Sequence, residues 1–192
     1  MEPAPSDGPK FLRERILRLT EDVGERARRI KLILMDVDGV LTDRRIIYQA
    51  ELDEAKGFDA HDGVGIKLAQ RAGLLTGVIT GRLSIATSRR ARELKMAEFH
   101  QKVFTKLEVL DSILKARRLP AEEVCFIGDD LVDIPAMKKV GLAAAPADAK
   151  PEALRVAHLV TAAGGGRGSV REVIEFILKV QGRWAKVAGA YL

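Results

Sequence analysis

Short apolar runs alternate with longer stretches of helical periodicity along most of the chain. The short runs predict buried strands at 32–35, 74–79, 124–127, 142–145 and 158–160. Between them, apolar residues recur three or four positions apart, which predicts helices near 65–72, 84–95, 106–118, 131–140 and 150–157. Strands that alternate with helices in this way are typical of an α/β fold, in which a parallel sheet carries helices on both faces.

Helical patterns also mark the two ends of the chain. Apolar residues such as Leu12 and Ile16 recur at helical spacing over 11–29, which predicts an amphipathic helix after a frayed N-terminal tail. Near the other end, Ser169 is followed three positions later by Glu172. This capping-box pattern predicts a last helix that begins at Ser169.

The connections between the predicted elements leave room for one folded domain. Residues 42–60 contain Ile46, Ile47 and Tyr48, and this stretch is long enough only for a small hairpin, which we call the flap. We therefore expect a three-layer α/β domain with a flap and no separate cap domain. The predicted divisions are a tail and helix over 1–29, the domain over 30–181 and a C-terminal tail over 182–192.

Composition narrows the class of protein. With 192 residues, 47% of them hydrophobic, the chain can form one domain with a full core, which excludes a disordered or low-complexity protein. No apolar run approaches the ~18 residues of a membrane span, and the N-terminus lacks the apolar stretch of a signal peptide. The single cysteine, Cys125, excludes an internal disulfide and suits a reducing compartment. We therefore expect a cytoplasmic protein with no membrane partner.

The net charge of +5 is a weak guide to partners. Basic residues stand in scattered pairs among acidic ones, and aromatic residues make up only 5% of the chain. Nucleic-acid binders more often concentrate basic residues in one stripe with aromatic residues between them. We therefore expect no nucleic-acid partner. A solvated surface explains most of the excess charge, and a small anionic substrate is consistent with it.

The first candidate site follows the first predicted strand directly. Asp36 and Asp38 stand two positions apart there, and ligands of open α/β sheets bind at the carboxyl ends of the strands. Paired carboxylates suit Mg²⁺. One carboxylate can also attack phosphorus while a second protonates the leaving alcohol. Alone, this pair is equally consistent with a turn stabilised by aspartate side chains.

Three further groups of polar residues follow other predicted strands or begin helices. Thr80, with Gly81 and Arg82, can hold phosphate oxygens, and Lys106 can balance phosphate charge. A second acidic group, Asp129, Asp130 and Asp133, follows the strand at 124–127 and suits a hard cation. Each group alone has an ordinary structural explanation. In this order, at successive strand ends, they indicate one crevice with a nucleophile, an acid/base, a phosphate clamp and a metal.

This order of residues resembles the phosphatases of the haloacid dehalogenase-like (HAD) superfamily over about residues 30–178, which implies the HAD-like Rossmannoid fold. A closer resemblance, to the capless 3-deoxy-D-manno-octulosonate (KDO) 8-phosphate phosphatase family, rests on several segments. They are DVDGVLT at 36–42, KGF at 56–58, DAHDGVGI at 59–66, ITGR at 79–82, IGDDLVDIP at 127–135 and GGGRGSVREV at 164–173. That family works in lipopolysaccharide precursor synthesis.

The resemblance implies a role for each matching residue. Asp36 would be the nucleophile and a Mg²⁺ ligand, and Asp38 the general acid/base, reaching the metal through its backbone carbonyl. Thr80 and Lys106 would hold the phosphoryl group. Asp129 would be the third metal ligand, with Asp130 and Asp133 in support. The positions implied to bind substrate are Asp38, Asp59, Ala60, His61, Asp62, Gly63, Gly81, Arg82, Arg90 and Lys106.

The resemblance also implies an assembly, a homotetramer in which the flap contacts a neighbouring subunit and the tail over 182–192 can close the site. Three residues depart from the family pattern: Arg44 replaces a usual Gly, Thr105 a usual Asp or Asn, and His61 a usual Arg or Lys. These departures bear on the sugar. KDO 8-phosphate is the first candidate substrate, and a nine-carbon acid such as N-acylneuraminate 9-phosphate is the alternative. A macromolecular phosphate substrate and a HAD-like binding module without catalysis also remain open.

Overall fold

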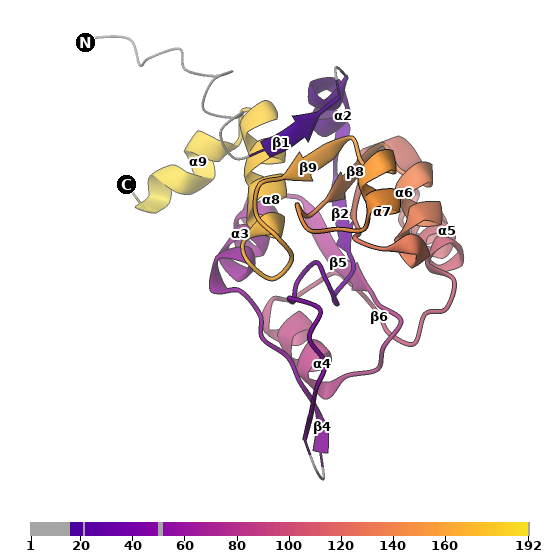
Figure 1. Ribbon diagram of the computed structural model, residues 1–192. Coiled ribbons are helices and arrows are strands. Elements are labelled where there is room, and N and C mark those ends of the chain that lie inside the picture. Colours follow the sequence, from indigo (N-terminus) through magenta and orange to yellow (C-terminus); the bar gives the residue numbers. More distant parts are fainter. Residues whose placement is uncertain (1–15, 21, 50–51, 192) are drawn as a thin grey trace, which may run out of the picture.

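A seven-stranded sheet forms the centre of the molecule in the computed structural model, which describes residues 16–20, 22–49 and 52–191 (Figure 1). The order across the sheet is β1-β9-β8-β7-β2-β5-β6, and all neighbours except β1 and β9 run parallel. The strands are β1 (Ile16–Leu19), β2 (Leu32–Met35), β5 (Leu75–Ile79), β6 (Glu98–His100), β7 (Val124–Ile127), β8 (Leu142–Ala145) and β9 (Leu159–Thr161). The predicted α/β fold with a parallel sheet is confirmed.

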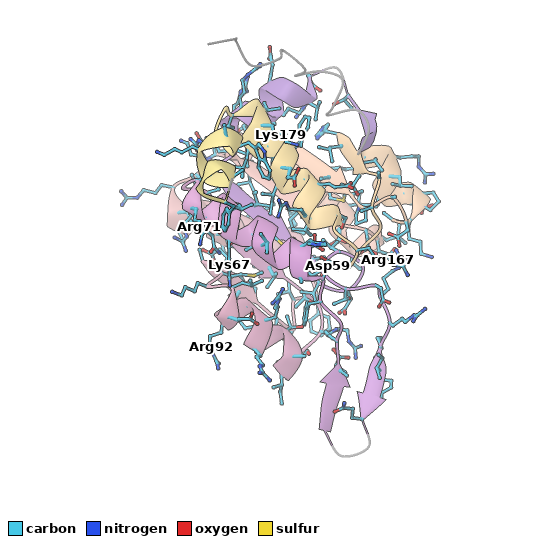
Figure 2. The ribbon with its side chains drawn as sticks, turned by 90° about the vertical axis from the view of Figure 1, so that its left-hand side faces the viewer. Asp59, Lys67, Arg71, Arg92, Arg167 and Lys179 are labelled. Carbon is cyan, nitrogen blue, oxygen red and sulfur yellow. The ribbon has the colours of Figure 1, made fainter. Side chains whose placement is uncertain are left out.

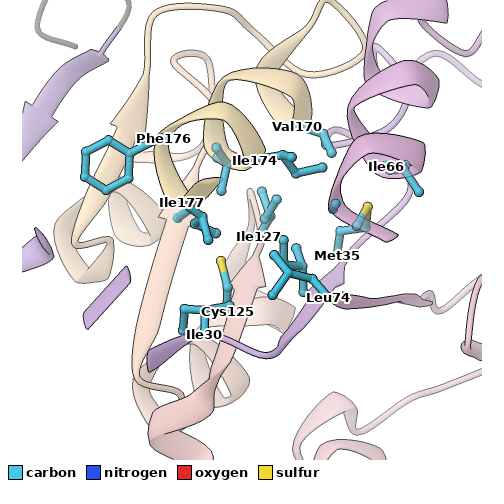
Figure 3. Packing of buried hydrophobic residues seen from close by; sticks show 14 of the residues in the cluster. Ile30, Met35, Ile66, Leu74, Cys125, Ile127, Val170, Ile174, Phe176 and Ile177 are labelled. Atoms are coloured by element: carbon cyan, nitrogen blue, oxygen red, sulfur yellow. The ribbon is translucent and has the colours of Figure 1, made fainter. Parts of the chain in front are cut away.

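Helices cover both faces of this sheet, because successive side chains of each central strand point to opposite sides. Met35 and Ile127 pack in one apolar cluster, and Leu34 and Phe126 pack in the other. Figure 3 shows the first cluster, with Ile127 and Cys125 beneath Ile174 and Ile177 of α8. Its helices are α2 (Val23–Arg29), α3 (Ala60–Arg71), α8 (Ser169–Val180) and α9 (Trp184–Ala188). The opposite face carries α5 (Lys106–Arg117), α6 (Ile134–Lys139) and α7 (Pro151–Val156).

The predicted flap is present as a hairpin. Strand β3 (Ile47–Gln49) pairs antiparallel with β4 (Leu52–Ala55), and the hairpin projects away from the main sheet (Figure 1). Helix α4 (Ile85–Glu93) packs beside β4. Within the described part of the chain, the segment between β2 and α3 contains no other helix or strand than this hairpin. The remaining helical elements are the 3₁₀ turns η1 (Ala121–Glu123), η2 (Leu131–Asp133) and η3 (Gly189–Tyr191).

The helix predicted over 11–29 is wrong in its first half. Residues Ile16–Leu19 form strand β1, and the helix is confined to Val23–Arg29; residues 11–15 lie outside the described residues. The apolar spacing does not distinguish a short strand from a helical turn. Strand β1 covers the backbone of β9, which would otherwise form an open edge of the sheet.

The capping box predicted at the start of the last helix is also wrong. The helix begins at Ser169 as expected, but Gly168, with φ +97°, occupies the N-cap, and no side chain of its own segment caps it. Glu172 instead accepts hydrogen bonds from the amides of Ala162 and Ala163, at 2.9 and 3.1 Å. The helix amides are satisfied from another element, by Asp62 of α3.

None of the described helices is long and apolar enough to cross a membrane.

Candidate active site

Three neighbouring strands deliver polar residues to one edge of the sheet. Met35 pairs with Val78 of β5 on one side and with Ile127 of β7 on the other, so β2, β5 and β7 end side by side. Asp36 follows β2 immediately, and Thr80 follows β5. Asp129 follows β7 after one glycine. The parallel register therefore gathers these residues at the carboxyl ends of the strands, as the sequence predicts.

Lys106 joins the acidic residues of this edge. It is the first residue of α5 and is only 3% exposed. Its ammonium nitrogen Nζ lies 2.7 Å from Oδ1 of Asp36 and 2.6 Å from Oδ1 of Asp133. Oδ2 of Asp133 accepts the backbone amides of Asp129 and Asp130, at 2.9 and 3.2 Å. Asp133 thus fixes both the lysine and the loop that carries Asp129.

Burial dominates the electrostatics of this cluster. It raises the pKa of Asp36 to about 6 although Lys106 opposes the shift. It raises the pKa of Asp129 to about 7, helped by the nearby charges of Asp133 and Asp36. Burial acts to lower the pKa of Lys106, but the carboxylates of Asp36 and Asp133 outweigh it, so that this pKa is raised and the lysine stays charged. Asp36 and Asp133 therefore share the ammonium group of Lys106, and Asp129 lies beside them as a third buried carboxyl group.

The donor set fits a hard divalent cation. Asp36, Asp129 and Asp133 each offer a carboxylate oxygen, and the three atoms lie within 4.8 Å of one another. Oδ1 of Asp129 is buried and accepts a hydrogen bond from none of the described residues. A buried acceptor without a donor is unfavourable unless something else satisfies it. Carboxylate oxygens in this arrangement suit Mg²⁺.

Two other residues named with this cluster lie at its margin. The side chain of Asp130 accepts the amide of Leu131 and caps η2. The carboxylate of Asp38 makes an ion pair with Lys56 of the flap. Asp38 therefore lies next to the cluster in sequence, but its side chain belongs to a different set of contacts.

These contacts form a chain of charges from Asp38 into the flap. The side chain of Lys56 is only 1% exposed, and its ammonium nitrogen lies 2.9 Å from Oε1 of Glu54. Glu54 accepts a hydrogen bond of 3.0 Å from Nε of Arg82, and this bond lowers the pKa of Glu54. The sequence analysis did not name Glu54, and it named Lys56 only within the KGF segment at 56–58, without a role. The burial of this lysine is not visible in the sequence.

A cavity of about 730 Å³ lies between the flap, the start of α3 and α4. Its walls combine apolar, basic and acidic side chains, and they include Phe58, Ala60, Ile85, Lys56, Arg89, Arg90, Glu54 and Glu93. Lys56 lines this cavity and also pairs with Asp38, which links the cavity to the loop that follows β2. The hollow has the size expected for a small ligand.

Several residues expected to bind substrate shape this cavity. Asp59 is the N-cap of α3 and accepts the amides of His61 and Asp62, at 2.6 and 3.1 Å. In Figure 2, Asp59 stands at the end of α3 nearest the hairpin, and Arg71 stands near the other end. Arg90 donates to the carbonyl of Asp59 at 3.2 Å.

Glycines allow close packing around these residues. An added Cβ at Gly63 would lie 2.3 Å from Nη2 of Arg90, so a larger residue there would require the arginine side chain to shift. Gly81, at the end of β5, has more room, since an added Cβ would lie 3.5 Å from the carbonyl oxygen of Val103. Thr80 beside it is 2% exposed.

Two other expected substrate residues face elsewhere. The side chain of His61 is 85% exposed and borders a separate hollow with Arg167 and Arg171. Asp62 is 1% exposed, and its two carboxylate oxygens accept the amides of Arg171 at 2.7 Å and Gly168 at 3.3 Å. Burial raises the pKa of Asp62 to about 6. The structure brings neither side chain to the cavity wall.

The tail over 182–192 packs on the domain itself as far as it is described. Trp184 lies against the guanidinium of Arg171 and the ammonium group of Lys179, and Tyr191 lies against Arg71. These contacts are with α3 and α8, on the side of the molecule where α9 lies in Figure 1.

Comparison with known proteins gives the family. A family model of haloacid dehalogenase-like hydrolases matches residues 87–173. The 3-deoxy-D-manno-octulosonate 8-phosphate phosphatase KdsC of Escherichia coli strain K12 is 37% identical over 171 residues, which cover 89% of this chain and 91% of the relative. KdsC of Yersinia pestis is 39% identical over the same length, with the same coverage of the two chains.

Solved structures agree. The KDO 8-phosphate phosphatase of Moraxella catarrhalis, in complex with magnesium, phosphate and KDO, superposes with a TM-score of 0.88 at 34% identity, covering 90% of this chain and 99% of that one. The Yersinia pestis enzyme superposes with a TM-score of 0.83 at 40% identity, covering 85% of this chain and 88% of that one. With these relatives and the acidic crevice at the carboxyl ends of its strands, this chain belongs to the KdsC family of haloacid dehalogenase-like phosphatases.

Proposed function

We propose that this protein is a Mg²⁺-dependent phosphatase that hydrolyses KDO 8-phosphate to KDO and phosphate. The observation that carries the proposal is the buried cluster of Asp36, Asp129 and Asp133 around Lys106. The relatives named for this reaction, and the Moraxella structure with magnesium, phosphate and KDO, support the same substrate.

In the proposed reaction, a carboxylate oxygen of Asp36 attacks phosphorus, and the bond between phosphorus and the sugar oxygen breaks. Asp38 donates its proton to the leaving sugar oxygen. Asp38, now a carboxylate, takes a proton from the water that attacks the aspartyl phosphate, and this step releases phosphate and restores Asp36. The sugar oxygen thus gains a proton from Asp38, and Asp38 recovers a proton from the attacking water.

The surrounding residues hold charge and geometry during both steps. Lys106, already in contact with Asp36, would stabilise the negative charge of the transferring phosphoryl group, and Thr80 would bind one of its oxygens. We assign Mg²⁺ to Asp36 and Asp129, with the backbone carbonyl of Asp38 as a further ligand. Asp133, whose oxygens already bind Lys106 and two amides, would support this site from behind. Bound Mg²⁺ supplies positive charge that lets a dianionic phosphate approach a carboxylate.

The cavity beside the flap would take the sugar acid. Arg89 and Arg90 supply positive charge, and Phe58 and Ala60 supply apolar surface. The side chain of His61 is turned away from this cavity, so its departure from the family pattern gives no support to a nine-carbon substrate. The homotetramer with flap contacts and the cytoplasmic location remain predictions.

The test is phosphate release from a panel of sugar phosphates, each with Mg²⁺ and with EDTA. We expect clear preference for KDO 8-phosphate over N-acylneuraminate 9-phosphate, hexose phosphates and nucleotides, and loss of release in EDTA. Preference for the nine-carbon acid would keep the mechanism and contradict the substrate. No metal-dependent release from any compound would contradict the proposal and favour a binding module.

A further inference from the structure

Arg44 has an unusual backbone conformation beside the acidic cluster. Its φ is +70°, in the left-handed region that residues other than glycine adopt at a cost of about 1–2 kcal/mol. The side chain fixes this geometry, because Nη1 donates a 2.7 Å hydrogen bond to the carbonyl of Asp148 and Nη2 makes an ion pair with the carboxylate of Asp148. The contact links the loop after β2 to the loop after β8.

The same guanidinium also lies near Asp129 of the acidic cluster. Its Nη1 lies 3.7 Å from Oδ2 of Asp129, whose side chain is only 3% exposed. Within the described part of the chain, Arg44 is the basic residue at ion-pair distance from Asp129, whereas Lys106 serves Asp36 and Asp133. Gly39 leaves the space for this approach, since an added Cβ there would lie 2.0 Å from Oδ2 of Asp129 and 2.8 Å from Cγ of Arg44.

We propose that Arg44 is a positioning residue that tunes the affinity of the cluster for a divalent cation. Without the cation, its charge compensates the Asp129 carboxylate. With the cation bound, the two positive charges repel each other across a buried carboxylate, where screening by water is weak. Arg44 therefore stabilises the cation-free protein and weakens cation binding. This inference rests on the metal site of the proposed function.

The test is calorimetric titration with Mg²⁺ alone, without phosphate or sugar, on the full chain. We expect Arg44→Gln to lower the dissociation constant of Mg²⁺ about threefold or more, and Arg44→Lys to stay near the wild type. The matched control is Arg45→Gln, because Arg45 is the neighbouring arginine, 76% exposed, and its ion-pair partner among the described residues is the half-buried Asp43. This control should leave the dissociation constant unchanged. Equal or weaker Mg²⁺ binding by Arg44→Gln would overturn the inference.

A second variant, Asp148→Asn, should change Mg²⁺ affinity in the opposite direction. Asp148→Asn removes the charge that holds the guanidinium and keeps an acceptor for the amide of Gly165, which donates to Asp148 at 3.0 Å. Arg44 would then pair more fully with Asp129, so Mg²⁺ should bind more weakly. In the Arg44→Gln background this effect should be much smaller. An Asp148→Asn effect of equal size in both backgrounds would contradict the inference.

Thermal unfolding tests separately whether Arg44 stabilises the cation-free protein and whether it weakens cation binding. In EDTA, Arg44→Gln should unfold at a lower temperature than the wild type, and Mg²⁺ should raise its midpoint by more. Asp129→Asn should abolish Mg²⁺ binding; if it does not, the assigned metal site is wrong and the inference falls with it. If the Mg²⁺ titrations agree but no sugar phosphate is hydrolysed, the proposed function fails alone.

Discussion

Asp36 and Asp62 are both buried carboxyl groups, but their partners differ. Asp36 is 6% exposed and Asp62 is 1% exposed, and burial raises the pKa of each to about 6. Asp62 accepts backbone amides on both oxygens, from Arg171 and Gly168. Asp36 contacts the ammonium group of Lys106 and shares its site with Asp129, which has an oxygen without a donor among the described residues.

A raised pKa alone therefore does not distinguish a carboxyl group of the active site from one that stabilises the fold. Around Asp62 every described partner is backbone that must be satisfied for α8 to begin where it does. Around Asp36 the partners are other charged side chains, and the cluster has acceptor capacity left over. An unsatisfied carboxylate oxygen beside two further carboxylates, rather than the shifted pKa alone, distinguishes the site around Asp36.

The largest expected effect separates these two carboxyl groups. Asp36→Asn should lower phosphatase turnover at least about a thousandfold, because an amide oxygen is a poor nucleophile toward phosphorus. Asp62→Asn is the matched control, a change of the same size at an equally buried position, and should keep most of the turnover per folded molecule. Steady-state phosphate release, corrected for folded fraction by circular dichroism, measures both. Residual Asp36→Asn activity above about a thousandth of the wild type would remove Asp36 from the nucleophile role.

The next effect concerns the ion pair that holds Asp38. Lys56→Met keeps the length of the side chain but releases the carboxylate, so kcat should fall about 10–100-fold, by more than KM rises. Lys67→Met is the control, since Lys67 is an exposed lysine on α3 (Figure 2). Steady-state kinetics against KDO 8-phosphate separate the two constants. A rise in KM with unchanged kcat would assign Lys56 to substrate binding instead.

The fold and the acidic cluster were largely predictable from the sequence, and for a common reason. Buried parallel strands are short apolar runs, and the residues that follow them must meet at one edge of the sheet. Asp36, Lys106, Asp129 and Asp133 could therefore be grouped without knowing any side-chain contact. The roles assigned to them are predictions that the kinetic tests address.

What the sequence did not indicate depends on contacts between distant segments. Strand β1 forms because β9 offers an open edge, and nothing in residues 16–19 records that edge. Asp62 caps α8 across more than a hundred residues of sequence, and Lys56 reaches Asp38 only because the flap folds back. The capping box and the helical stripe are local patterns. In the structure, Asp62 caps α8 in place of the first, and pairing with β9 forms a strand in place of the second.

A smaller effect, on stability, follows from the role of Asp62 at the start of α8. Asp62→Asn should lower the free energy of unfolding by about 1–3 kcal/mol, because an asparagine offers one oxygen where two amides need acceptors. Urea unfolding at pH 7 in EDTA measures the change. Asp59→Asn is the control, since Asn caps a helix about as well as Asp and should cost little. Equal stabilities of Asp62→Asn and Asp59→Asn would show that α8 begins without help from Asp62.

The last expected effect is the pH dependence of that same difference. The pKa of Asp62 is about 6 in the folded protein and 3.8 without burial, so the folded state binds this proton more tightly than the unfolded state does. The stability that comes from this bound proton is therefore fully present below pH 3.8 and is lost as the pH rises through about 6, whereas the contribution of the two amide hydrogen bonds remains. Asp62→Asn has no such titration. The free energy of unfolding of the wild type minus that of Asp62→Asn should thus fall by about 2 kcal/mol between pH 4 and 6.5.

The subtraction isolates Asp62 from the other raised carboxyl groups. The contributions of Asp36 and Asp129 to the free energy of unfolding also fall as the pH rises. Because they fall in both proteins, they cancel in the difference. Urea titrations at four pH values in EDTA give the curve. A difference that stays constant or grows toward pH 6.5 would mean that the two amide hydrogen bonds outweigh burial at Asp62. Burial would then govern the ionisation of Asp36 and Asp129 but not that of Asp62. Asp36 and Asp62 would then share low exposure but not a raised pKa.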